Sequence, residues 1–180
     1  MFSLFSALIL KLWGWKVSAY PHEVPKLVLA VAPHTSNWDF PVGIFVRSAV
    51  KANAVFVAKH TIFVPPFGWL LRRWGGVPVD RRQRGNFVTG VIEEFHKRDY
   101  FHVCIAPEGT RSKVHKFKTG FYHIAKGAGV PILLCTFDWG NMTVTFGELF
   151  QPTDDEEKDL AYIWNYYKGV KGKNPEKGIL

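Results

Sequence analysis

Five stretches of the chain are almost continuously apolar, which is the pattern of strands buried on both faces of a sheet. They span residues 26–32, 54–58, 77–79, 101–106 and 131–137, and a sixth stretch, residues 142–146, alternates like an edge strand. Helical patterns lie between them at residues 39–51, 66–74, 86–97, 119–126 and 154–167, the last opened by a capping box of Thr153 and Glu156. We therefore expect one α/β domain, with a mostly parallel or mixed β-sheet flanked by helices on both faces.

The first 25 residues read as an amphipathic segment that precedes this domain. The apolar run from Met1 ends at Lys11, whereas a spanning helix needs roughly 18 apolar residues. On a helical wheel a weakly polar stripe separates from the apolar side chains: Ser3, Ala7, Lys11, Gly14 and Ser18 form it, and Phe2, Phe5, Ile9, Leu12, Trp13 and Lys16 lie off it. Because Trp and Lys suit a bilayer interface, we expect residues 1–25 to lie on a membrane; docking on the domain itself is the alternative.

The two ends of the chain also bear on location. A secretory signal begins with basic residues, but here the first cation follows the apolar run, so we expect a peripheral protein at the cytoplasmic face of the cell membrane. Residues 26–167 then form the folded domain. Residues 168–180 are rich in Gly and Lys, and we expect a flexible, frayed tail.

Two loops that follow apolar stretches carry reactive residue types. In an open α/β sheet, ligands bind beyond the carboxyl ends of the strands. The first loop, residues 33–39, reads PHTSNWD, and the second, residues 107–112, reads PEGTRS. In the second loop Gly109 lets the backbone approach a ligand, while Thr110 and Arg111 supply hydrogen-bond donors. We expect chemistry at this edge of the sheet.

His34 and Asp39 can meet only if the chain bends between them, because residues five apart on a helix point about 140° away from each other. Pro33 and the turn-forming residues 35–37 supply that bend. His34 would then lie in a loop and Asp39 in the first helical turn. A carboxylate that accepts from one ring nitrogen leaves the other free as a base. A helix cap and an ordinary loop histidine remain the alternatives.

The charge of the chain points to an anionic partner. There are 23 Lys+Arg against 15 Asp+Glu, a net charge of +8, and ten of the cations lie between Arg47 and Arg98 with only three acids. Arginine binds phosphate with a planar fork of donors. A solvated basic face is the alternative for most of these side chains. Cys104 and Cys135 lie in separate apolar runs, and we expect both to be reduced and buried.

Four segments together resemble the sequence blocks of the glycerolipid acyltransferases, in order and in approximate spacing. They are His34-x₄-Asp39, residues 75–82 (GGVPVDRR), residues 107–112 and Val130-Pro131-Ile132. Within that superfamily the chain looks most like the 1-acyl-glycerol-3-phosphate acyltransferases. The resemblance covers about residues 27–140, and it marks residues 26–167 as an acyltransferase domain.

The resemblance implies an O-acyltransferase that moves a fatty acyl group from acyl-CoA or acyl-carrier protein to the hydroxyl of a lysophospholipid. The acceptor it implies is above all 1-acyl-glycerol-3-phosphate, which becomes phosphatidate. His34 would be the general base and Asp39 would orient it. The residues implied to bind the acceptor and its phosphate are Lys59, Arg81, Glu108, Gly109, Thr110 and Arg111. No metal, no cofactor and no nucleic-acid partner is implied.

One position departs from the family pattern. Many members have Asn before the histidine, where this chain has Pro33, so one hydrogen bond around the base must be made differently. Two further hypotheses remain open: the same chemistry on another lysolipid acceptor, and a non-catalytic binder of anionic lipid or nucleic acid that uses the basic stretch.

Overall fold

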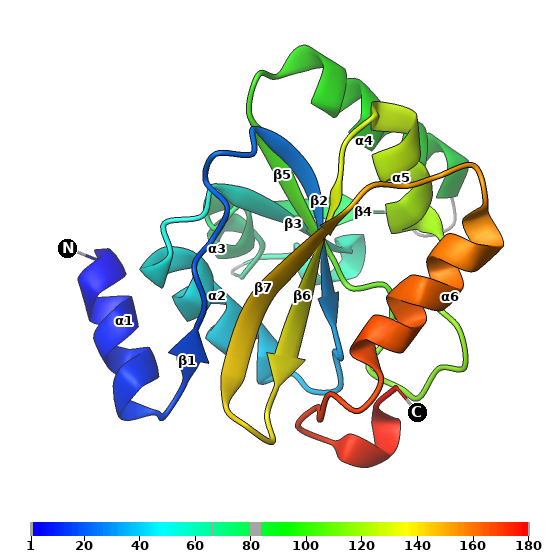
Figure 1. Ribbon diagram of the computed structural model, residues 1–180. Helices are drawn as coiled ribbons and strands as arrows, with labels where there is room; N and C mark the ends of the chain where they lie inside the picture. Colours follow the sequence, from blue (N-terminus) through cyan, green and yellow to red (C-terminus); the bar gives the residue numbers. More distant parts are fainter. Residues whose placement is uncertain (1, 66, 80–83, 180) are drawn as a thin grey trace.

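A mixed seven-stranded sheet runs through the computed structural model, which describes residues 2–65, 67–79 and 84–179 (Figure 1). The strand order is β1-β7-β6-β2-β5-β3-β4. Only β6 and β7 pair antiparallel among the described strands, so β1 and β7 run against the other five. The strands are β1 Lys16–Val17, β2 Lys26–Ala32, β3 Ala54–Lys59, β4 Gly76–Val79, β5 Phe101–Ile105, β6 Ile132–Asp138 and β7 Thr143–Phe150.

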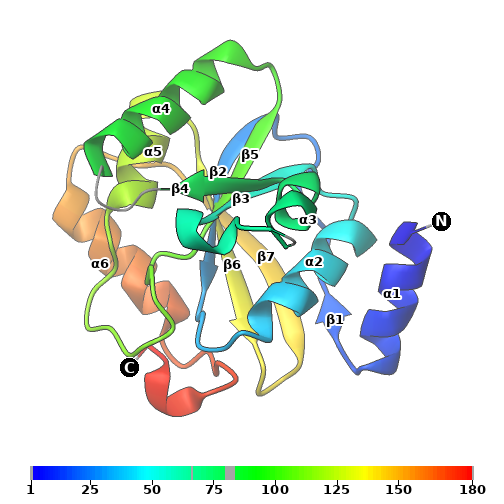
Figure 2. The same ribbon diagram turned by 180° about the vertical axis from the view of Figure 1, so that it is seen from behind.

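Helices cover both faces of the sheet, as the sequence predicts (Figures 1 and 2). They are α1 Phe2–Leu12, α2 Asp39–Ala49, α3 Phe67–Arg73, α4 Arg84–Lys97, α5 Gly120–Ala128 and α6 Glu156–Tyr167, with the short 3-10 turns η1 His60–Ile62 and η2 Pro175–Lys177. Figure 2 shows α1, α2 and α3 side by side in front of the sheet. None of the helices in the described ranges has both the length and the apolar character needed to cross a bilayer.

The central strand β2 shows why the sheet is buried on both faces. Successive side chains of a strand point to opposite faces. Val28 and Ala30 therefore pack into the core beneath α4, α5 and α6, whereas Leu27 and Leu29 pack into the core beneath α1 and α2. In the strand order, β2 lies between β5 and β6, so its carboxyl end is near the middle of the sheet.

The predicted helix at the amino end is shorter than expected. We placed Gly14, Lys16 and Ser18 on one helical wheel, but α1 ends at Leu12 and Gly14 turns the chain with a φ of +86°. Lys16 then pairs with Thr143 of β7, so the chain joins the sheet as β1. The placement of these three residues on the helix was wrong, because the edge of β7 offered backbone hydrogen bonds that the helical pattern does not reveal.

The predicted capping box at the start of α6 was also wrong. The residue that caps the helix is Asp155, whose side chain accepts from the backbone N–H of Lys158 at 3.1 Å. The Thr153 hydroxyl instead donates to the buried Asp159 carboxylate at 2.9 Å. Thr153 is itself exposed and takes part in the hydrogen bonds around the buried Asp159, while Asp155 caps the helix.

The carboxyl-terminal segment differs from the frayed tail that we expected. The backbone N–H of Trp139 donates to the Lys171 carbonyl at 2.8 Å, and Asn174 is hydrogen-bonded to Thr35. Ile179 is only 4% exposed and belongs to the main core. The segment packs because its partners lie in loops far away in sequence, which its Gly- and Lys-rich composition does not show. Both cysteines are free, as predicted, but only Cys135 is buried and Cys104 is partly exposed.

Candidate active site

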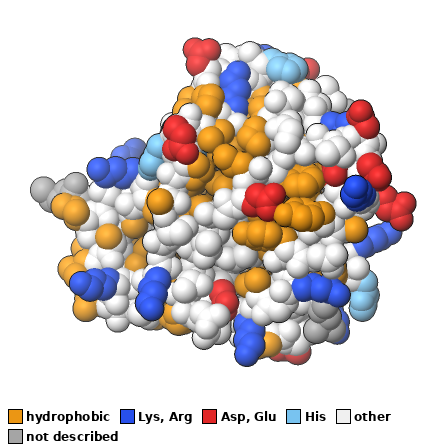
Figure 3. All heavy atoms as spheres, viewed as in Figure 1, with side chains coloured by type: hydrophobic (Ala, Val, Ile, Leu, Met, Phe, Trp, Pro, Cys, Tyr) orange, Lys and Arg blue, Asp and Glu red, His pale blue; other side chains and the backbone are white. Residues whose placement is uncertain are grey.

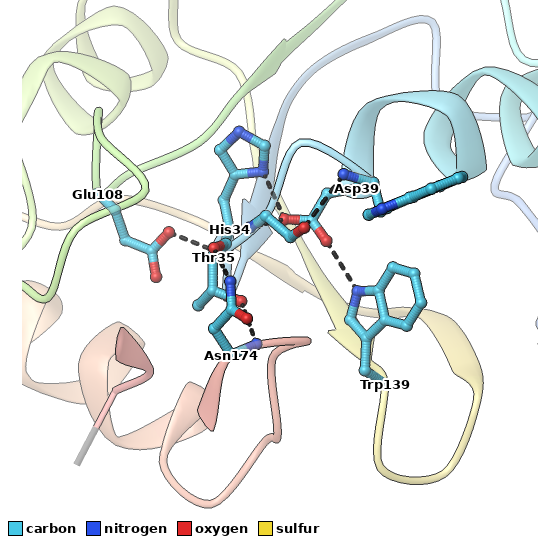
Figure 4. Close-up of polar contacts among 8 residues, drawn as sticks. His34, Thr35, Asp39, Glu108, Trp139 and Asn174 are labelled. Atoms are coloured by element: carbon cyan, nitrogen blue, oxygen red, sulfur yellow. Dashed lines mark hydrogen bonds and ion pairs between the residues drawn. The ribbon is translucent and has the colours of Figure 1, made fainter. Parts of the chain in front are cut away.

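His34 and Asp39 meet at the carboxyl end of β2 (Figure 4). His34 lies in the loop that leads to α2, and Asp39 is the first residue of that helix. The Nδ1 atom of His34 is 3.0 Å from Oδ2 of Asp39. The histidine side chain is 23% exposed and the carboxylate 5%, so the pair reaches the surface only on the histidine side. The predicted bend and contact are confirmed.

Both oxygens of Asp39 have donors. Oδ2 also accepts from the backbone N–H of Ser36 at 2.9 Å, and Oδ1 accepts from Nε1 of Trp139 at 2.7 Å. Asp39 is not the cap residue of α2, since that position is Trp38, and its negative charge suits the positive end of the helix. Because the carboxylate only accepts, Nδ1 of a neutral His34 carries the hydrogen. Nε2 is then the free base.

Glu108 connects the second predicted loop to the first. Strands β2 and β5 are neighbours, so the loops that follow them meet at one edge. Oε2 of Glu108 accepts from the backbone N–H of His34 at 2.7 Å. This hydrogen bond holds the loop that carries His34, in a chain that has Pro33 where many family members have Asn. The carboxyl group is therefore engaged with the loop.

The Glu108 carboxyl is buried, at 2% exposure, and its Oε1 has no hydrogen-bond partner among the described residues. Burial raises the pKa of Glu108 to about 7, which the hydrogen bond from His34 opposes and the nearby charge of Asp39 reinforces. The group therefore changes its charge near neutral pH, in contact with the backbone of His34.

The other residues implied by the family resemblance are placed less completely. Gly109 has a φ of +62°, a left-handed conformation that favours glycine. Thr110 is half-buried, and its hydroxyl accepts from the backbone N–H of Ser112 at 3.3 Å. Arg111 is exposed. The structure brings this loop beside His34 through Glu108.

Two predicted cationic ligands cannot be placed. Arg81 lies outside the described residues. Lys59 ends β3, but its side chain also lies outside the described part of the chain. Within residues 2–65, 67–79 and 84–179 there is no group of three or more His, Cys, Asp or Glu side chains that could hold a metal ion.

Sequence reasoning missed three residues at this site. Trp139 lies in the turn after β6, and its indole reaches Asp39. Thr35 is 2% exposed, and Asn174 donates to it twice, from its backbone N–H to Oγ1 at 3.1 Å and from Nδ2 to the carbonyl at 2.8 Å. The turn after β6 lies at the same edge of the sheet as the β2 loop, so the strand-end rule could have found Trp139. No sequence signal pointed to Asn174.

The sequence of this chain is similar to those of known proteins. The family model described as Acyltransferase matches residues 19–137. The 1-acyl-sn-glycerol-3-phosphate acyltransferase of Salmonella typhimurium is 33% identical over 119 residues, which are 62% of this chain and 47% of that protein. The enzyme of the same name from Haemophilus influenzae is 30% identical over 179 residues, 83% of this chain and 71% of that protein.

A solved structure has the same fold. The 1-acyl-sn-glycerophosphate (LPA) acyltransferase PlsC from Thermotoga maritima superposes with a TM-score of 0.61 and 23% identity, covering 92% of this chain and 74% of that one. The match to the Salmonella protein spans about half of that protein's length.

Replacing Glu108 with Gln should change how stability depends on pH. An unfolded Glu ionises near pH 4.5, whereas the native pKa is about 7, so the contribution of this group to stability is complete below pH 4.5 and is lost as the pH rises to 7. Gln keeps an acceptor for the His34 N–H and carries no charge. The free energy of unfolding of the variant relative to wild type should therefore rise by about 3 kcal/mol between pH 4.5 and about pH 8.

Urea unfolding at several pH values measures this difference. Glu93→Gln, which removes an exposed carboxyl, is the matched control and should run parallel to wild type. If Glu108→Gln also runs parallel to wild type, the buried carboxyl does not have the raised pKa.

Proposed function

This chain belongs to the acyltransferase family, and from that premise we propose that it transfers a fatty acyl group from a thioester donor to the free hydroxyl of 1-acyl-glycerol-3-phosphate, giving phosphatidate. The observation that carries this proposal is the 3.0 Å contact between His34 and Asp39 at the carboxyl end of β2. Similarity to two 1-acyl-sn-glycerol-3-phosphate acyltransferases supports the choice of acceptor. The donor is acyl-CoA or acyl-carrier protein.

In the proposed reaction Nε2 of His34 takes the proton from the acceptor hydroxyl. The oxygen attacks the thioester carbonyl, the C–O bond forms, and the C–S bond breaks. The proton then passes from the imidazolium to the departing thiolate, so His34 returns to its neutral form. Asp39 stabilises the imidazolium through Nδ1. Because the thioester is already activated, the reaction as proposed needs neither a metal nor a further cofactor.

The proposed acceptor site extends from His34 along the loop that carries Glu108. Arg111 is exposed two residues beyond Gly109, and its planar fork suits a phosphate monoester. The backbone of Gly109 and the hydroxyl of Thr110 belong to the same loop and would line the proposed acceptor site. Lys59 and Arg81 stay predictions as further phosphate ligands.

We also infer that the protein binds a membrane surface through α1. The outward side chains of this helix are apolar, and Phe2, Leu4, Phe5, Leu8 and Leu12 are each more than half exposed. The buried side chains of α1 are Ser6 and Leu10. A helix that packs only on its own protein exposes polar side chains rather than a row of apolar ones. Figure 3 shows hydrophobic side chains gathered at the left edge of the molecule, where α1 lies, with Lys or Arg side chains nearby.

A second apolar segment lies on the same side of the sheet. Val64, Phe67 and Trp69 in and before α3 are each more than half exposed, and α3 stands beside α2 in Figure 2. Residues 1–22 and 40–79 contain no Asp or Glu but seven Lys or Arg. Apolar side chains in segments whose charged residues are all cations suit an anionic lipid surface. That this surface is the cytoplasmic face of the cell membrane stays a prediction.

Replacing His34 with Ala should abolish acyl transfer, because the general base is lost. We expect kcat/KM to fall roughly 10²- to 10⁴-fold, measured as thiol release from acyl-CoA or acyl-carrier protein in the presence of lysophosphatidate. His123→Ala removes an exposed histidine of α5 and should leave the rate unchanged. Circular dichroism confirms that both variants fold. Equal rates for His34→Ala and wild type would contradict the proposal, and lipid binding without any turnover in wild type would favour a non-catalytic binder.

Replacing Arg111 with Ala should raise KM for lysophosphatidate about tenfold or more, because a charge-assisted contact to phosphate is lost. The rate with a monoacylglycerol acceptor, which has no phosphate, should be unaffected. Arg98→Ala is the control, since this exposed arginine pairs with Glu94 on α4. An unchanged KM for lysophosphatidate would show that the acceptor is recognised without Arg111 and would favour another lysolipid.

Replacing Leu8 of α1 or Phe67 of α3 with Glu should weaken membrane binding. Each change removes about 1.5–3 kcal/mol of apolar burial in lipid and adds a repelled charge, so partitioning should fall at least about tenfold. Flotation with vesicles of phosphatidylglycerol and phosphatidylcholine measures it. Leu149→Glu alters an exposed leucine of β7 and should bind like wild type. Wild-type binding by both test variants would contradict the proposed surface.

A further inference from the structure

The Asp39 carboxylate depends on a donor from a distant part of the chain. Its Oδ2 is used by His34 and Ser36, both in its own loop. Among the described residues, the hydrogen bond to Oδ1 comes from Nε1 of Trp139, which lies 100 residues further along and is 2.7 Å away. This bond crosses from the turn after β6 to the start of α2.

A carboxylate held by one oxygen only can still turn about its last bond. The indole donor removes that freedom, because the two oxygens now face fixed partners on opposite sides (Figure 4). The direction of the lone pair that receives Nδ1–H of His34 is thereby set. A buried carboxylate oxygen without a donor also destabilises the folded protein, so the bond keeps Asp39 in this rotamer.

Trp139 is itself held from two directions. Its ring makes an edge contact with Trp15 at 4.9 Å between centroids, and its backbone N–H donates to the Lys171 carbonyl at 2.8 Å. The Nζ of Lys173 lies 4.4 Å from the centre of the Trp139 ring and 4.8 Å from that of Trp38. The indole is thus fixed between the chain that leaves α1 and the carboxyl-terminal segment.

The same segment holds the other end of the histidine loop. Asn174 donates to both the hydroxyl and the carbonyl of Thr35, the residue after His34. At Gly172 the backbone approaches so closely that a Cβ would lie 2.5 Å from Oγ1 of Thr35. Residues 171–174 therefore contact Trp139 and Thr35, on either side of the His34–Asp39 pair.

We propose that Trp139 is a positioning residue of the acyl transfer, acting through Asp39, and that residues 171–174 hold Trp139 and Thr35 in place for it. The inference rests on the proposed function, because orienting His34 through Asp39 matters only if His34 is the base of the acyl transfer. It acts on the orientation of the base and not on the binding of the acceptor.

Trp139→Phe tests the proposal, because phenylalanine keeps a ring against Trp15 and removes the donor to Asp39. We expect kcat to fall about tenfold while KM for lysophosphatidate stays within about twofold. Trp164→Phe is the matched control, since this tryptophan of α6 is also partly buried and packs on Phe117 in the core beneath α4, α5 and α6. That variant should keep the wild-type kcat. A Trp139→Phe enzyme with wild-type kcat would overturn the proposal, whereas a wild-type enzyme without acyl transfer would overturn the proposed function.

A double-mutant cycle separates positioning from general damage to the fold. If Trp139 acts through Asp39, adding Trp139→Phe to Asp39→Asn should lower kcat by less than about twofold further. A further tenfold loss in that background would contradict the proposal.

Asn174→Asp tests the carboxyl-terminal segment, because it replaces the donor to the Thr35 carbonyl with a repelling oxygen at equal size. We expect kcat to fall severalfold at an unchanged KM. Wild-type kcat would show that residues 171–174 do not hold the loop.

Discussion

The Asp39 carboxylate is the interaction on which the site depends. It is buried, it accepts hydrogen bonds from Ser36 and Trp139, and it contacts His34 at 3.0 Å. These donors come from the β2 loop and from the turn after β6. A buried carboxylate is stable only when such donors are present, so the groups that solvate Asp39 also fix the direction of the imidazole.

The sheet makes this convergence possible. Strand β2 lies between β5 and β6, and the three strands run parallel, so the loops after all three meet at one edge. The β5 loop brings Glu108 beneath the backbone of His34, and the β6 turn brings Trp139 to Asp39. On the face with α1, α2 and α3, exposed apolar side chains suit the proposed lipid surface from which the acceptor would come.

Much of the fold could be predicted from the sequence, because strands buried on both faces leave continuous apolar runs. The contact of His34 with Asp39 was also predictable, since it is local and needs only a bend. Asn174 was missed because its contact joins residues 139 apart, and such a pairing has no signature in local pattern. Trp139 lies 100 residues from Asp39, and only the strand-end rule, applied to the turn after β6, could have pointed to it. The same limit explains β1, whose two residues gain their partner only once β7 is in place.

The most direct measurement of the central claim is the protonation state of the two ring nitrogens of His34, read from nitrogen-15 chemical shifts. In the neutral form, Asp39 should hold the hydrogen on Nδ1 and leave Nε2 bare, and Asp39→Asn should abolish this preference. His96, an exposed histidine of α4, supplies the reference for a histidine without such a constraint. A hydrogen on Nε2 of His34 in the wild-type protein would contradict its role as the base that faces the acceptor.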